Sequence, residues 1–172
     1  MNLTNTSFNS IEERIREYAK RDSSYPLQAM LMYRMHVHIH QKIQDARNRI
    51  LKEYNITETI FIALIIIDSK IEKMIQPSLL SEILGLSKTS ATRIADELVK
   101  NKWVERYYTK EDRRCIFLKI TPHGLEFLER IRPKQFENLV TICSALDENE
   151  QIIFEKLSRK ILAKVESLEN QE

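Results

Sequence analysis

The sequence contains very little glycine, and this scarcity excludes several classes of protein. Only two of the 172 residues are glycine, Gly85 and Gly124. No phosphate-binding loop of the GxGxxG or GxxxxGK[ST] type can therefore be written, which removes most ordinary nucleotide-binding enzymes. Two glycines and four prolines also disfavour a fold of many tight β-turns. We expect a mostly helical (α+β) protein.

Cysteines and long apolar runs are scarce as well. Cys115 and Cys143 are too few and too far apart for a disulfide framework or a CxxC zinc site, a pattern typical of the reducing cytoplasm. The N-terminus has no basic segment followed by an apolar stretch, so no secretory signal is predicted. The longest apolar run, residues 60–67, is far shorter than the roughly 20 residues of a membrane-spanning helix. We expect a cytoplasmic protein with no cofactor and no metal.

The residues that are present favour one globular domain of helices with recognisable starts. Hydrophobic residues make up 42% of the chain and charged residues 30%, and 172 residues suit a single domain. Residues 60–67 are apolar on nearly all sides, which places their helix at the centre of the fold. Helix starts are predicted at Ser10 with Glu13, Pro26, Thr57, Thr121-Pro122, and Asp147 with Glu150. Pro133 is predicted to kink or interrupt the helix around it, because proline lacks an N–H.

Residues 77–120 have the pattern of a helix-turn-helix followed by a hairpin. Pro77 begins a short helix that ends before Gly85, a residue able to take positive φ. Ser87 caps a second helix that extends to about Asn101, and two helices joined by a short glycine-containing turn are typical of this motif. Residues 103–108 and 114–120 are rich in aromatic and β-branched residues and flank a charged segment, which predicts a β-hairpin.

The second helix of this motif is amphipathic, and its surroundings are basic. At about 100° per residue, one side is apolar and the opposite side is polar. The apolar side holds Ala91, Ile94, Ala95 and Leu98, and the outward side holds Thr89, Arg93, Asp96 and Lys100, flanked by Ser90 and Glu97. Residues 87–119 carry nine Lys or Arg and five Asp or Glu, a net +4 in a chain of net +2. Short hydroxylated side chains and an arginine on one helix face suit the major groove of DNA.

Several motifs in this region together resemble those of the MarR family of winged-helix transcription regulators. They are residues 80–87 (LSEILGLS), 92–98 (TRIADEL), 103–106 (WVER), the Asp112-Arg113-Arg114 wing, and the exit from Leu118 through Thr121 to Gly124. Within the family the chain is similar to the EmrR (MprA) branch over roughly residues 11–168. The resemblance implies a homodimer on an inverted-repeat operator, formed through the N- and C-terminal helices. It also implies repression that a small aromatic or phenolic effector relieves, and control of a multidrug-efflux operon.

We therefore predict a sequence-specific DNA-binding repressor, with residues 1–172 as one MarR-type domain. Residues 11–51 and 122–168 would form the dimerisation region, and residues 57–120 the winged helix-turn-helix. Phosphate contacts are predicted for Ser87, Lys88 and Ser90, and base contacts for Thr89, Thr92 and Arg93. From the resemblance, Arg113 or Arg114 enters the minor groove and Asp112 braces an arginine. An effector pocket is predicted at Tyr33, His36, Leu64 and Met74, and a dimer surface at Ile11, Ile15, Phe154, Leu157, Ile161 and Val165.

Other interpretations remain open for residues outside this scheme. His36 and His40 share a helix face and could bind a metal, or with His38 they could be partly buried, pH-responsive groups. Cys115 follows two arginines and could sense oxidants.

The aromatic residues of the hairpin also allow two interpretations. Trp103 and the pair Tyr107-Tyr108 could stack on single-stranded nucleic acid, but we favour packing of Trp103 against the second helix. An enzyme is disfavoured, because no nucleophile, base and orienting group are arranged in glycine-containing turns. A helical adaptor would leave the basic segment without a role.

Overall fold

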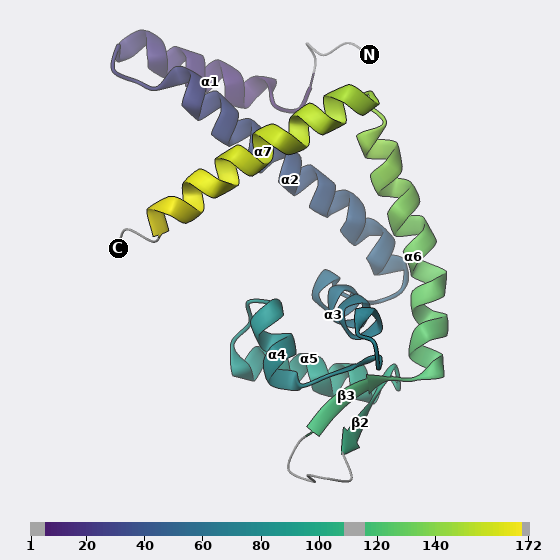
Figure 1. The fold of residues 1–172 in the computed structure, drawn as a ribbon. Helices are drawn as coiled ribbons and strands as arrows, with labels where there is room; N and C mark the ends of the chain where they lie inside the picture. The colour runs from purple at the N-terminus through teal and green to yellow at the C-terminus, as the bar shows by residue number, and fades with distance from the viewer. Residues whose placement is uncertain (1–5, 109–115, 170–172) are drawn as a thin grey trace. The chain divides into compact units, whose positions relative to one another are not determined.

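The computed structural model describes residues 6–108 and 116–169, and the chain divides into two compact units, Met1–Glu58 and Thr59–Glu172. Helices dominate the described residues (Figure 1). The helices are α1 (Asn9–Arg21), α2 (Leu27–Glu53), α3 (Glu58–Ser69), α4 (Pro77–Ile83), α5 (Lys88–Lys100), α6 (Pro122–Cys143) and α7 (Glu148–Glu169). The strands are β1 (Met74–Ile75), β2 (Val104–Tyr108) and β3 (Ile116–Ile120). In the described part of the chain, no helix combines the length and the apolar character needed to span a membrane.

In the first unit α1 packs on α2, and the predicted capping box at its start is wrong. The helix begins at Asn9, after Phe8, and Ser10 lies inside it. Phe8 is buried, with 2% of its surface exposed, and its ring contacts the ring of His38 on α2. The Asn9 side chain accepts hydrogen bonds from the backbone N–H and the hydroxyl of Thr6. Burial of Phe8 therefore sets the helix start two residues earlier than the polar signal indicates.

The central position predicted for residues 60–67 is confirmed in the second unit. The five fully or nearly buried residues of α3 are Ile60, Phe61, Ala63, Leu64 and Ile67. These positions lie on several sides of the helix, so α3 has no continuous polar face that could point to water. It begins at Glu58, directly after the predicted Thr57 start.

A three-stranded antiparallel sheet completes the winged helix, in the order β1-β3-β2. The β2–β3 hairpin was predicted, and its register places Val104 opposite Ile120 and Arg106 opposite Leu118. Strand β1 was not predicted, because two residues are too few to show an alternating pattern. It pairs with β3 through Met74 and Ile75.

The helix starts predicted near the C-terminus are confirmed. Of the two outcomes predicted at Pro133, a kink or an interruption, the interruption is wrong. The Thr121 hydroxyl accepts a hydrogen bond from the N–H of Gly124, and Pro122 occupies the first turn of α6. Asp147 and Glu150 cap α7 reciprocally, each side chain accepting the other's backbone N–H at 2.9 Å. Helix α6 continues through Pro133 to Cys143, with buried Ile131 and Gln135 on either side of the proline. Packing of this face offsets the hydrogen bond that proline removes.

Candidate DNA-binding site

The turn between α4 and α5 is held by side-chain and backbone bonds to the first helix. Gly85 takes φ of 62°, the positive value that its position after a helix was predicted to need. The Leu86 N–H donates to the Ser81 carbonyl at 2.9 Å, and the Ser81 hydroxyl donates to the Leu86 carbonyl at 2.8 Å. These two bonds fix where α5 begins relative to α4, and α4 and α5 pack together beside the hairpin (Figure 1).

Helix α5 presents the predicted outward face to solvent. Ser87 caps the helix, its hydroxyl oxygen accepting from the Ser90 N–H at 3.2 Å. Ala91, Ala95 and Leu98 are buried, whereas all six predicted DNA-contact residues on this helix are exposed: Ser87, Lys88, Thr89, Ser90, Thr92 and Arg93. The Thr92 hydroxyl donates to the Lys88 carbonyl at 3.0 Å, so its oxygen remains an acceptor for a base donor. The first two turns of α5 thus form a hydroxyl-rich surface with two cations at the positive end of a helix dipole.

The hairpin carries an ion pair that the sequence interpretation missed. Arg106 of β2 contacts Asp96 of α5, with 2.6 Å between Nη2 and Oδ1. On the same strand, the Tyr107 ring lies under the Lys119 ammonium, 5.2 Å from the ring centroid. The wing residues predicted to contact or brace DNA, Asp112, Arg113 and Arg114, lie outside the described residues, as does Cys115.

Trp103 belongs to the core rather than to a stacking platform. Its ring stacks on Phe127 of α6, with centroids 4.2 Å apart and planes 18° apart, and only 7% of the residue is exposed. The ring stacks on α6, and the Trp103 backbone N–H donates to the Leu98 carbonyl of α5, the second helix of the motif, at 3.1 Å. Tyr107 and Tyr108 are both more than one third exposed, so of the three aromatic residues considered for stacking only these two reach the surface.

An ion-pair cluster joins α3 to α6 and was also missed. Asp68 contacts Arg132 and Lys73, with its side chain 17% exposed. Partial burial opposes ionisation of Asp68, but the hydrogen bonds from Arg132 and Lys73 outweigh that effect and hold its pKa below the ordinary value. Asp68 and Arg132 are 64 positions apart in the sequence, so no short-range sequence pattern predicts their contact.

The remaining candidate residues lie in different environments. His36 and His40 are exposed, whereas His38 bonds to the Ser7 hydroxyl at 2.8 Å. Among residues 6–108 and 116–169 no three His, Cys, Asp or Glu side chains gather in a way that could hold a metal ion. Of the predicted effector residues, Tyr33 and His36 are exposed, Met74 is half-buried and Leu64 is fully buried. Cys143 is an exposed free thiol.

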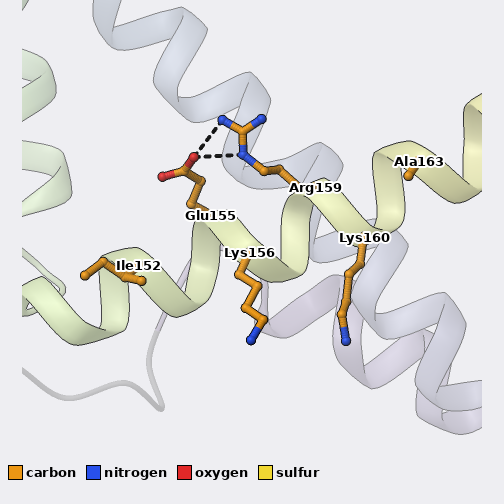
Figure 2. Close-up of a pocket in the computed structure, with 6 residues that line it drawn as sticks. All are labelled: Ile152, Glu155, Lys156, Arg159, Lys160 and Ala163. Atoms are coloured by element: carbon orange, nitrogen blue, oxygen red, sulfur yellow. Dashed lines mark hydrogen bonds and ion pairs between the residues drawn. The ribbon is translucent and has the colours of Figure 1, made fainter.

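Helix α7 is amphipathic, and neither of its faces is buried within the described chain. Its exposed apolar residues include the predicted dimer positions Phe154, Leu157, Ile161 and Val165, each about half exposed. Figure 2 shows a hollow along this helix, lined by Ile152, Glu155, Lys156, Arg159, Lys160 and Ala163, with an ion pair between Glu155 and Arg159. All six residues come from one helix, and none of the predicted effector residues lines the hollow.

Comparison with known proteins identifies the family. Residues 56–116 match the MarR family. The Escherichia coli (strain K12) protein named transcriptional repressor MprA is 42% identical over 164 residues, which cover 95% of this chain and 93% of that protein. The structure is similar to that of AbsC, a MarR family transcriptional regulator from Streptomyces coelicolor, with a TM-score of 0.72, 17% identity and coverage of 80% and 94% of the two chains. It is also similar to a mutant MarR from E. coli complexed with operator DNA, with a TM-score of 0.67, 26% identity and coverage of 78% and 96%. The chain therefore belongs to the MarR family and is a winged-helix transcriptional regulator, not an enzyme.

Proposed function

We propose that this protein represses transcription by binding an inverted-repeat operator as a homodimer, with α5 of each protomer in the major groove. The observation that carries the proposal is the exposed face of α5, where hydroxyls, Lys88 and Arg93 surround a capped helix N-terminus. Helix N-termini and short polar side chains bind phosphates, whereas an arginine in the groove reads guanine. The similarity to a MarR structure that contains operator DNA supports the same use of the fold. As a chromosome-binding regulator, the protein would act in the cytoplasm.

The proposed contacts of α5 are of two kinds, to phosphates and to base edges. Ser87, Lys88 and Ser90 lie at the N-terminal end and would contact phosphates. Thr89, Thr92 and Arg93 would contact base edges. From the resemblance to the family, the wing adds Arg113 or Arg114 in the minor groove, with Asp112 bracing an arginine.

The dimer would be formed by the terminal helices. The apolar residues of α7, about half exposed in the single chain, need a partner to leave water, and a second copy supplies an identical stripe under two-fold symmetry. Ile11 and Ile15 of α1 belong to the same proposed region, although Ile15 is already buried in the single chain.

The effector and the target operon are further parts of the proposal and rest on the resemblance to the EmrR branch. A small aromatic or phenolic ligand would release DNA by preferring the non-binding arrangement of the two α5 helices. Tyr33 and His36 offer exposed polar and aromatic groups, whereas a ligand reaches Leu64 only where the core around α3 opens. The operon under control would encode a multidrug-efflux system, so that the ligand induces its expression.

Two substitutions on α5 test the proposed division between base and phosphate contacts. Arg93→Ala should weaken binding to the selected operator by about 1–3 kcal/mol while leaving binding to unrelated duplex nearly unchanged, because a base contact carries sequence information. Lys88→Ala should weaken both duplexes alike and flatten the salt dependence. Fluorescence anisotropy on the two duplexes measures this, and an equal loss on both duplexes for Arg93→Ala would contradict base reading.

A further inference from the structure

An acidic residue lies on the face of α5 that is proposed to meet DNA. Asp96 is three residues after Arg93 and four before Lys100, so the three side chains share one side of the helix. Its side chain is 59% exposed. An exposed carboxylate near phosphates is repelled by them, so its presence on this face requires a physical explanation.

The partner of Asp96 also occupies an unusual position. In the register of the hairpin, Arg106 faces Leu118 as Val104 faces Ile120. Side chains directly opposite each other lie on the same face of a sheet, and Val104, Leu118 and Ile120 are all buried. Arg106 therefore lies on the face of β2 that is turned toward the core. Its side chain is nevertheless 45% exposed, and its guanidinium contacts Asp96 at the surface. A long arginine side chain can reach the surface from such a position while its apolar stem stays near the core.

We propose that Arg106 is a further phosphate-contacting residue and that Asp96 positions it. The inference rests on the proposed DNA-binding function. The bond to Asp96 uses Nη2, and a guanidinium has five N–H donors in a fixed fork, so other donors remain for a phosphate oxygen of the strand that passes between α5 and the hairpin. Asp96 restrains the long side chain, and its own charge is offset by the cation that it holds.

This arrangement and simple charge repulsion predict opposite signs for one substitution. If Asp96 only repels DNA, Asp96→Asn removes a negative charge and tightens binding. If Asp96 positions Arg106, the same substitution replaces the ion pair by a weaker neutral hydrogen bond, restrains the guanidinium less and weakens binding. Glu97, the neighbouring exposed acid on α5, provides a matched control, because Glu97→Gln removes the same charge without touching the ion pair.

The experiment measures affinity of the full chain for the selected operator and for an unrelated duplex, at several salt concentrations, by fluorescence anisotropy. The proteins are the wild type, Asp96→Asn, Arg106→Gln, Arg106→Lys, Glu97→Gln and the Asp96→Asn/Arg106→Gln double variant. Thermal unfolding checks the folding of each variant, and an exposed pair contributes too little for its loss to unfold the domain. Arg106→Lys keeps the charge and supplies a second measure if Arg106→Gln lowers stability.

Asp96→Asn should bind both duplexes about threefold to tenfold more weakly than the wild type. In the Arg106→Gln background the same substitution should strengthen binding, because there Asp96 is an unpaired acid. Arg106→Gln should lower the salt slope by about 0.9 for each protomer. Glu97→Gln should bind as tightly as the wild type or more tightly.

Tighter binding by Asp96→Asn in the wild-type background, or an unchanged salt slope in Arg106→Gln, would overturn this inference while leaving the proposed function intact. Failure of the wild type to bind any duplex would instead overturn the proposed function.

Discussion

At the scale of single residues, the two glycines have different physical reasons for their positions. Gly85 takes a positive φ after α4, and an added Cβ would meet no atom within 4 Å, so glycine is favoured there by backbone conformation. Gly124 lies in the first turn of α6, where an added Cβ would stand 2.1 Å from the backbone oxygen of Trp103. Glycine is needed at this second position because the chain entering β2 packs directly on α6.

Substituting each glycine separates these two causes. Gly124→Ala should destabilise the protein by about 3 kcal/mol, because neither backbone can move without disturbing the Trp103–Phe127 stack. Gly85→Ala should cost only about 1 kcal/mol, the penalty of a left-handed conformation without a clash. Denaturant unfolding measures both values. An equal loss of unfolding free energy in the two variants would contradict the close contact between the Trp103 backbone and α6.

At the scale of helices and strands, the sequence predicted the elements that carry local signals and missed those that depend on distant residues. Ser87, Thr121 and Asp147 begin helices because capping acts within one turn, and the outward face of α5 follows from helical periodicity. The start of α1 and the continuity of α6 at Pro133 depend on burial, which local signals do not report. The ion pairs Asp68–Arg132 and Asp96–Arg106 each join two different elements. The only sequence feature that points to the Asp96–Arg106 pair is a charged residue, Arg106, at an inward position of β2.

The cluster between α3 and α6 makes a pH-dependent contribution to stability. The pKa of Asp68 is lowered in the folded protein, so its stabilisation is complete above the unfolded value of about 3.9 and is lost as the pH falls through the lower folded value. Asp68→Asn should reduce the free energy of unfolding at pH 7 by about 1–2 kcal/mol. The difference from the wild type should shrink as the pH falls below about 4.

Denaturant unfolding over a pH series measures this difference. Asp45→Asn, at an exposed position of α2, serves as the control and should leave stability unchanged at every pH. A gap between Asp68→Asn and the wild type that stays constant down to the lowest pH would contradict the role of ionised Asp68.

At the scale of the whole molecule, the proposed association of two chains would cover the exposed apolar surface of α7. Leu157 is 52% exposed in the single chain and lies in the middle of the stripe. Leu157→Lys should leave the helical content unchanged but convert the dimer to monomer, because a charge cannot be buried at the proposed interface without a partner. Arg159→Gln, about 200° around the helix, should remain a dimer. Sedimentation of the two variants measures this, and a dimeric Leu157→Lys would contradict an interface through α7.

The central claim is that two copies of α5 read duplex DNA together, and selection from a random pool tests it most directly. The wild-type chain is incubated with random duplexes, and the retained DNA is sequenced over successive rounds. The account predicts enrichment of an inverted repeat whose half-sites are centred roughly 34 Å apart, one turn of the double helix. Retained DNA without a common sequence, or an enriched site without two-fold symmetry, would contradict it.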